Sequence, residues 1–202
     1  MPQKPKENYK SDPNEINPKD FCQTPPYALT PLLPFIRGLK VWESASGNGA
    51  IVDVLRAEGF SVLATDLNMG PEFNYFTWAP EPDEYDAQVT NPPFGLKFKW
   101  MKRAYEIGKP WAMIMPTEVM GSSKALAMFE KYGVEIITLD SRVDYKMPNL
   151  GWDGAGSKFP STWFTYGLNI GAPITYGKIA QEKKAFKKKL EAERIGQLSM
   201  EL

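Results

Sequence analysis

The residues best suited to chemistry form the tetrapeptide Asn91-Pro92-Pro93-Phe94, which follows a short predicted strand over 85–90. The two prolines fix backbone φ angles and remove two N–H donors, so the Asn91 side chain and the Pro92 carbonyl are not used by a strand ladder. An amide, a rigid backbone and an aromatic ring can together hold a flat group with an exposed amine, such as adenine. The alternative is a plain strand terminator, since such proline dipeptides are common in turns.

A second group of candidate residues surrounds the small-residue turn 44–49, which follows Glu43 and contains Gly47 and Gly49. Doubly wound folds bind nucleotide-like ligands at such a turn after the first strand, because glycines let the ligand approach the backbone. Asp66 ends the next predicted strand and could accept hydrogen bonds from ribose hydroxyls. Glu43 would repel a pyrophosphate and attract a cation, which favours a sulfonium and amino-acid ligand over a dinucleotide. The alternative is that Glu43 only caps the local turn.

The composition excludes several classes of chemistry. The chain of 202 residues has no histidine and one cysteine, Cys22. Ser-His-Asp and Cys-His catalysis and histidine-ligated zinc are therefore excluded, no internal disulfide is possible, and no metal site is expected. The balance of 24 basic and 24 acidic side chains does not exclude a nucleic-acid partner, because a local patch is enough for binding. No apolar run has membrane-spanning length and no signal-peptide pattern is present, so a cytoplasmic protein without membrane contact is expected.

The elements that must position these residues alternate between strand-like and helix-like patterns. This alternation indicates an α/β domain with a mostly parallel sheet. The predicted strands span 39–43, 61–66, 85–90, 111–115, 134–139 and 162–168. The predicted helices span 32–37, 50–58, 97–107, 122–132 and 178–202.

These segments predict three regions. Residues 1–17 are poor in apolar side chains and are expected to form a mobile N-terminal tail. Residues 18–170 are expected to form the catalytic domain, and residues 171–202 a basic C-terminal helical tail. The lysines that make this tail basic are Lys183, Lys184, Lys187, Lys188 and Lys189. The tail could bind the backbone of a nucleic acid, or it could be a solvated face that packs on the domain.

A long segment over 142–160 mixes basic and aromatic side chains. It contains Arg142, Tyr145, Lys146, Trp152, Lys158 and Phe159. Segments of this length without regular structure are uncommon inside a domain. Basic groups mixed with aromatic rings suit phosphates and unstacked bases, whereas an ordinary surface loop is the alternative.

The motifs described above resemble those of S-adenosylmethionine-dependent adenine-N6 DNA methyltransferases of the Asn-Pro-Pro-Phe type. The likeness extends upstream to the segment 21–25 and covers roughly residues 20–170. It implies a Rossmann-like methyltransferase fold, with a seven-stranded, mostly parallel sheet, an antiparallel last strand and helices on both faces. The chain leaves no room for a separate target-recognition domain, so it is similar to minimal, phage-like members. We expect relaxed or short sequence specificity, and a bacterial or phage-infected cell as the setting.

The resemblance also implies roles for individual cofactor-binding residues. Thr24 and Glu43 would lie near the methionine part of S-adenosylmethionine, with Gly47 and Gly49 beneath it. Asp66 would bind the ribose hydroxyls. The family usually carries an acidic-aromatic pair beside the cofactor adenine; here the nearest match is Asn74-Tyr75-Phe76, without the acid. The aromatic role would fall to Tyr75 or Phe76.

The catalytic roles follow from the chemistry of an exocyclic amine, whose lone pair is delocalised into the ring. Asn91 and the Pro92 carbonyl can both accept hydrogen bonds from that amine, Pro93 keeps the backbone rigid, and Phe94 can stack on the base. DNA is the expected partner. The alternatives are the same chemistry on RNA, glutamine methylation of a protein, and a non-catalytic nucleic-acid-binding subunit. Monomer and homodimer both stay open.

Overall fold

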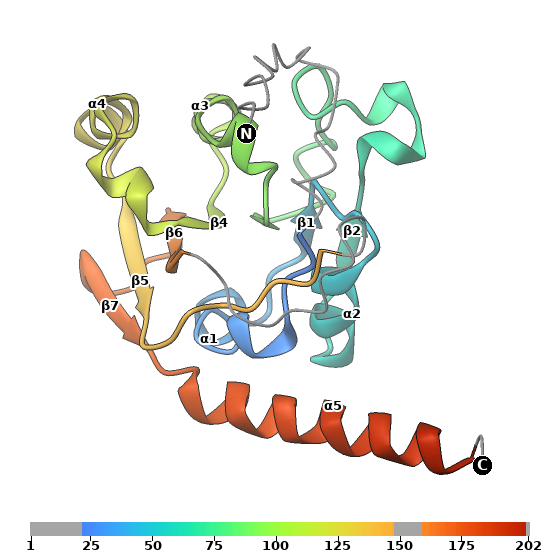
Figure 1. Ribbon diagram of the computed structural model, residues 1–202. Coiled ribbons are helices and arrows are strands. Elements are labelled where there is room, and N and C mark those ends of the chain that lie inside the picture. The colour runs from blue at the N-terminus through green and yellow to red at the C-terminus, as the bar shows by residue number, and fades with distance from the viewer. Residues whose placement is uncertain (1–21, 148–158, 201–202) are drawn as a thin grey trace, which may run out of the picture.

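A seven-stranded sheet lies at the centre of the structure, a computed structural model that describes residues 22–147 and 159–200 (Figure 1). The strands follow the spatial order β2-β1-β3-β4-β6-β5-β7. Strand β6 is antiparallel to its neighbours β4 and β5, and the other paired strands are parallel. The strands are β1 (Val41–Glu43), β2 (Val62–Ala64), β3 (Ala87–Thr90), β4 (Trp111–Pro116), β5 (Glu135–Leu139), β6 (Ser161–Tyr166) and β7 (Ile174–Gly177).

The predicted α/β class and the mostly parallel, seven-stranded sheet are confirmed. The six strands predicted from the pattern are β1 to β6, and the last of these is the antiparallel one. Strand β7 was not predicted, and it lies in the region 171–202 that was expected to be helical. Its Ile-Thr-Tyr run is rich in strand-forming residues and pairs with β5 in parallel, so the helix begins only at Ala180.

Alternating residues along the strands build two hydrophobic cores, one on each face of the sheet. On β4, Trp111, Met113 and Met115 pack into one core, whereas Ala112 and Ile114 pack into the other. All six residues of β4 are buried. This burial is the reason for a continuous apolar run in the sequence, because a central strand with both faces covered has no polar side.

Helices cover both faces of the sheet, as predicted. Helices α1 (Leu33–Ile36) and α2 (Ala50–Ala57) pack on one face, and α3 (Lys97–Ile107) and α4 (Ser123–Tyr132) on the other (Figure 1). Helix α5 (Ala180–Met200) lies on the side of α1 and α2 and extends past them (Figure 1). Short 3-10 turns are η2 (Pro26–Ala28), η3 (Leu67–Met69), η4 (Pro71–Phe73), η5 (Phe94–Leu96) and η6 (Thr117–Gly121).

The predicted N-terminal tail, 1–17, and part of the aromatic segment, including Trp152 and Lys158, lie outside the described residues. In the part of the chain that the structure describes, no helix combines the length and the apolar character needed to cross a membrane.

Candidate cofactor and substrate site

The predicted site residues meet at the carboxyl edge of three neighbouring strands. Glu43 ends β1, Asp66 follows β2 and Asn91 follows β3. Because these strands are parallel and adjacent in the order β2-β1-β3, their ends lie at one edge of the sheet. One pocket at this edge is lined by Cys22, Gln23, Thr24, Glu43, Ala45, Ser46, Gly47, Asn48, Ala50, Ile51, Asp66, Asn91 and Pro93. The structure therefore brings Thr24, Glu43, Gly47, Asp66 and Asn91 together around one pocket.

The turn after β1 depends on its two glycines. Gly47 and Gly49 have φ angles of 48° and 84°, in the left-handed region that favours glycine. Gly49 precedes helix α2 as its N-cap, and its N–H donates to the Ser46 carbonyl at 2.7 Å. The pocket is lined by Gly47 but not by Gly49. Gly49 thus shapes the turn, whereas Gly47 lies where a ligand would meet the backbone.

Asp66 connects the second strand to this turn. Its Oδ2 accepts a hydrogen bond from the Gly47 N–H at 2.8 Å, and its Oδ1 accepts one from the Asn68 N–H at 2.9 Å. These two contacts fix the orientation of the carboxylate. Each carboxylate oxygen has a further lone pair, so the group can still accept hydrogen bonds from two hydroxyls of a ligand.

Glu43 is almost completely buried, with 1% of its surface exposed. Its Oε1 accepts a hydrogen bond from the Ala45 N–H at 2.9 Å. Burial raises the pKa of the carboxyl group from 4.5 to about 8, and the negative charge of Asp66 adds to this rise. A cation placed beside Glu43 would favour the carboxylate and lower the pKa again. A positively charged ligand would therefore fit beside Glu43, whose Oε1 also caps the local turn.

Two buried side-chain oxygens of pocket residues, Thr24 Oγ1 and Asn91 Oδ1, have no hydrogen-bond partner among the described residues. The Glu43 carboxyl, by contrast, interacts with the Thr90 hydroxyl, and this hydrogen bond offsets part of the rise in the pKa of Glu43. Leaving a buried polar atom unsatisfied costs about 1–3 kcal/mol. Two such oxygens beside one pocket favour a polar ligand there.

Asn91 is held in a defined orientation. Its Nδ2 donates to the backbone carbonyl of Cys22 at 2.9 Å, so the side-chain oxygen is left as the acceptor at the pocket. Of the two prolines that follow, Pro92 is buried and Pro93 lines the pocket. The amide nitrogen is thus used inside the protein, and the buried oxygen beside the pocket keeps its capacity to accept a hydrogen bond.

Phe94 begins η5 and is partly buried. Its ring meets those of Tyr145 and Phe159 edge-on, with centroids 5.8 Å and 5.6 Å apart. Tyr145 and Phe159 belong to the described ends of the segment 142–160, and both lie beside the tetrapeptide. Tyr145 is 3% exposed and its hydroxyl donates to Ser161 Oγ at 2.9 Å, so it supports Phe94 from the core rather than facing a ligand.

Phe76, the predicted contact for the cofactor adenine, does not line the pocket. Its ring packs edge-on against Tyr75 and Trp100, at centroid distances of 5.7 Å and 5.3 Å. Tyr75 is itself stacked on Trp100 and is 3% exposed. This aromatic cluster belongs to the core beneath α3, and the pattern of aromatic residues in the sequence could not distinguish packing from ligand contact.

Sequence reasoning missed three residues at or beside the pocket. Thr90 precedes the tetrapeptide and its hydroxyl interacts with the Glu43 carboxyl, yet a threonine in a strand gives no signal of function. Cys22 orients Asn91 through its backbone carbonyl, which leaves no trace in residue type. Ile51 lines the pocket from α2, where its spacing indicates only a core position. In the residues described, no group of three or more Cys, Asp or Glu side chains is arranged to hold a metal ion.

Comparison with known proteins gives a likeness of fold only. No model of a protein family matches the chain, and no curated protein matches it. Several solved structures resemble it at low identity, three of them as follows. One is named as a predicted O-methyltransferase from Agrobacterium tumefaciens, at 15% identity and a TM-score of 0.43, with 76% of this chain and 85% of that chain covered.

The second is named as a modification subunit of a type I restriction enzyme from Vibrio vulnificus, at 12% identity and a TM-score of 0.47. The match covers 77% of this chain and 45% of that chain, so this chain spans less than half of that subunit's length. The third is named as a class I S-adenosylmethionine-dependent methyltransferase from Listeria monocytogenes, at 13% identity and a TM-score of 0.49, covering 85% of this chain and 68% of that chain.

Proposed function

We propose that this protein is an S-adenosylmethionine-dependent methyltransferase that acts on the exocyclic N6 amine of adenine in DNA. The observation that carries the proposal is the unsatisfied Oδ1 of Asn91, which lies in the same pocket as Glu43 and Asp66. The Nδ2 group of Asn91 fixes the orientation of the side chain at the end of β3, so its Oδ1 can accept a hydrogen bond from an amine nucleophile. A structural asparagine would have both ends of its amide satisfied.

The residues of the pocket fit the proposed cofactor. Asp66 would bind the ribose hydroxyls, and Glu43 with the Thr24 hydroxyl would face the charged methionine part. The backbone at Gly47 leaves room for close approach. When bound, the cofactor supplies an activated methyl group: the new bond from nitrogen to the methyl carbon forms as the bond from sulfur to that carbon breaks, and sulfur keeps the electron pair.

The protein contributes mainly by positioning the amine. Asn91 Oδ1 and the Pro92 carbonyl accept hydrogen bonds from the two amine hydrogens, which draws electron density toward the nitrogen and directs its lone pair at the methyl group. Orientation of this kind can supply effective molarities on the order of 10⁵ M or more. No histidine is needed, and the proton lost from the product nitrogen can pass to water.

Phe94 would hold the plane of the base, with Tyr145 and Phe159 behind it. In duplex DNA the target base would first leave the stack, at a cost of a few kcal/mol. We expect short or relaxed sequence specificity. The second candidate is the same reaction on RNA, because the pocket contains the same acceptors for either polymer. Glutamine methylation ranks lower because Phe94 suits an aromatic substrate. A non-catalytic role ranks lower because the unsatisfied Asn91 oxygen suits a catalytic site.

The test is a transfer assay with S-adenosylmethionine that carries a labelled methyl group. The protein is incubated separately with DNA, RNA and cell protein, and the modified residue is identified by mass spectrometry. N6-methyladenine in DNA is the expected product. Methyl groups on adenine in RNA alone would favour the second candidate, whereas N4-methylcytosine or methylglutamine would refute the adenine assignment. Cofactor binding without transfer to any polymer would support the non-catalytic alternative.

A further inference from the structure

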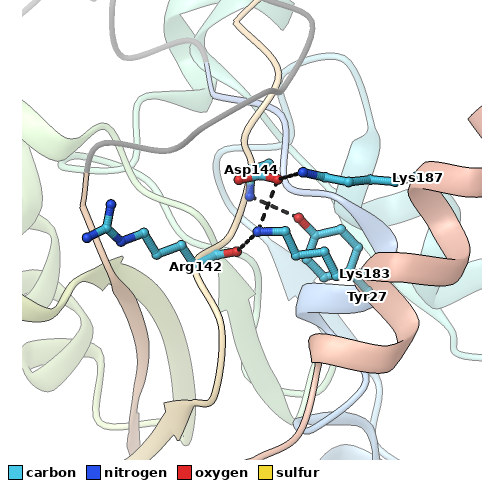
Figure 2. A network of polar contacts seen from close by, with 5 residues as sticks. All are labelled: Tyr27, Arg142, Asp144, Lys183 and Lys187. Atoms are coloured by element: carbon cyan, nitrogen blue, oxygen red, sulfur yellow. Dashed lines mark hydrogen bonds and ion pairs between the residues drawn. The ribbon is translucent and has the colours of Figure 1, made fainter.

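The basic helix α5 uses two of its lysines inside the protein. Lys183 and Lys187 place their Nζ atoms 3.1 Å and 2.6 Å from the same oxygen, Oδ2 of Asp144 (Figure 2). Lys183 Nζ also donates to the Arg142 carbonyl at 2.7 Å. The Asp144 side chain is 5% exposed, against 16% for Lys183 and 52% for Lys187. Asp144 and Lys183 are thus nearly buried, whereas Lys187 reaches the same carboxylate from a half-exposed position.

The cluster is joined to the site through consecutive backbone contacts. The Asp144 N–H donates to the Tyr27 hydroxyl at 2.9 Å (Figure 2). Two residues later, Lys146 exchanges two backbone hydrogen bonds with Gln23, of 2.8 Å and 3.2 Å. The residue before Gln23 is Cys22, and its carbonyl accepts the hydrogen bond that orients Asn91. A continuous path of hydrogen bonds and neighbouring residues of the chain therefore runs from α5 to the amide of Asn91.

Helix α5 is itself fixed to the domain, so it can act as a rigid support. Asp140 Oδ1 accepts hydrogen bonds from the Ile179 and Ala180 N–H groups at the start of the helix. The Ile179 side chain is fully buried, and Phe186 packs edge-on against Tyr27 at 5.7 Å. The first half of α5 is thus anchored before Lys183 and again between Lys183 and Lys187, while residues 191–197 are exposed.

We propose that Lys183 and Lys187 are positioning residues for the proposed methyl transfer, and that their grip on Asp144 holds the 144–146 segment and the 22–24 segment against Asn91. The proposal rests on the proposed function for its effect on turnover. It assigns these two lysines a role inside the protein. The basic sequence pattern alone suggests instead that they contact the phosphates of a nucleic acid. Removing either lysine weakens the neutralisation of a nearly buried carboxylate, which then withdraws toward water and takes the 144–146 segment with it.

The experiment compares single substitutions in the full chain. Lys187→Met removes the more exposed member of the pair, and Lys188→Met is the matched control on an exposed lysine one position away. We expect Lys187→Met to speed amide hydrogen exchange at Gln23 and Lys146 about tenfold, because their mutual bridge loses its support. The kcat for methyl transfer should fall about tenfold, since a misplaced acceptor loses catalytic orientation. Lys188→Met should change neither the exchange rates nor kcat. Lys187→Arg, which keeps the positive charge, should leave both close to the values of the unmodified protein.

A second readout separates this role from binding of the polymer. DNA affinity is measured by fluorescence anisotropy with a labelled oligonucleotide over a range of salt concentrations. A lysine that contacts phosphate lowers the salt dependence of binding when it is removed. We expect Lys187→Met to leave that dependence unchanged. A reduced salt dependence with normal exchange at Gln23 and Lys146 would overturn the proposal and identify Lys187 as a phosphate contact.

Hydrogen exchange also tests the structural role of the two lysines without depending on methyl transfer. If the unmodified protein transfers no methyl group to any polymer, the proposed function fails, while exchange at Gln23 and Lys146 still decides whether α5 supports the site. Unchanged exchange in both Lys187→Met and Asp144→Asn refutes the support. Should Asp144→Asn fail to fold, Lys187→Met decides alone, since its side chain is half exposed.

Discussion

Asn91 is the single residue on which the proposed chemistry depends most directly. Its side chain is fixed by one hydrogen bond, from Nδ2 to the Cys22 carbonyl, and its oxygen has no partner among the described residues. In the proposed reaction the two ends of the amide would therefore have separate roles: the nitrogen would fix the orientation, and the oxygen would contact the substrate. This division predicts that loss of the amide affects turnover rather than the binding of the cofactor.

Asn91→Ala should lower kcat by about 10²-fold or more, because the amine loses its oriented acceptor. Cofactor affinity should stay close to that of the unmodified protein, since Asp66 and Glu43 are intact. Single-turnover kinetics measures the first quantity and isothermal titration calorimetry the second. Asp66→Ala is the matched comparison and should mainly weaken cofactor binding. An equal loss of affinity in Asn91→Ala would identify the residue as structural.

Glu43 makes ligand binding depend on pH. Its pKa in the folded, unliganded protein is raised to about 8, so the carboxyl is mostly protonated at pH 6 to 7. A cationic ligand prefers the carboxylate, so its binding expels the proton and its affinity should rise between pH 6 and 7.5. Above this range the amino group of the cofactor, with a pKa of about 7.7–8.0, also titrates. Calorimetry in buffers of different ionisation enthalpy should detect the released proton, and Glu43→Gln should abolish both effects.

The same residue affects the stability of the unliganded protein, with a sign that can be worked out. The folded pKa of Glu43 lies above its ordinary value of 4.5, so the folded state binds the proton more tightly than the unfolded state. The stabilisation that this provides is complete below pH 4.5 and is lost as the pH rises through 8. Urea unfolding of the Glu43→Gln variant should show a weaker decline over this window than the unmodified protein.

At the scale of elements, the turn between β1 and α2 is the one that local sequence specifies most tightly. Gly49 has a φ of 84° and ends the turn as the N-cap of α2. An added Cβ would meet Asp53 at 3.7 Å, an ordinary contact, so space is not the constraint. The constraint is the left-handed backbone itself, which asparagine tolerates better than alanine.

Gly49→Ala should therefore lower the free energy of unfolding by about 1–2 kcal/mol, and Gly49→Asn by less than that. Chemical denaturation measures both variants under the same conditions. Equal destabilisation by the two substitutions would show that side-chain crowding, and not backbone strain, decides the choice of glycine at this position.

At the scale of the whole molecule, strand β6 ties the sheet to the segment before α1. Trp163 on β6 is fully buried, and its Nε1 donates to the Ala28 carbonyl at 2.7 Å. The opposite case is Tyr176 on the edge strand β7, which is 78% exposed. Both are aromatic residues in strands, so only the tertiary structure tells the supporting residue from the surface residue.

Trp163→Ala should cost about 3–5 kcal/mol of unfolding free energy, because it leaves a cavity and an unpaired carbonyl in the core. Tyr176→Ala, the matched aromatic substitution on the edge, should change it by about 0.5 kcal/mol or less. Thermal and urea unfolding test the pair together. A large loss in Tyr176→Ala would mean that the exposed face of β7 is covered in solution.

The sequence by itself determined the α/β class, the positions of six strands, and the placement of Glu43, Asp66 and Asn91 at strand ends. These features follow from local causes: apolar periodicity, glycine turns and prolines that end a strand. Parallel strands then bring their carboxyl ends to one edge, so the proximity of these three side chains could be anticipated without a structure.

Tertiary structure alone decided how the side chains are used. The contact between Asn91 and Cys22 joins residues 69 positions apart, and the ion pairs of Lys183 and Lys187 reach Asp144 from a helix that looked like a solvated basic tail. Phe76, an equally plausible ligand contact by type, was assigned to the core instead. Such pairings depend on how elements that are distant in the sequence pack together. The type of a residue does not by itself show which distant residue will become its partner.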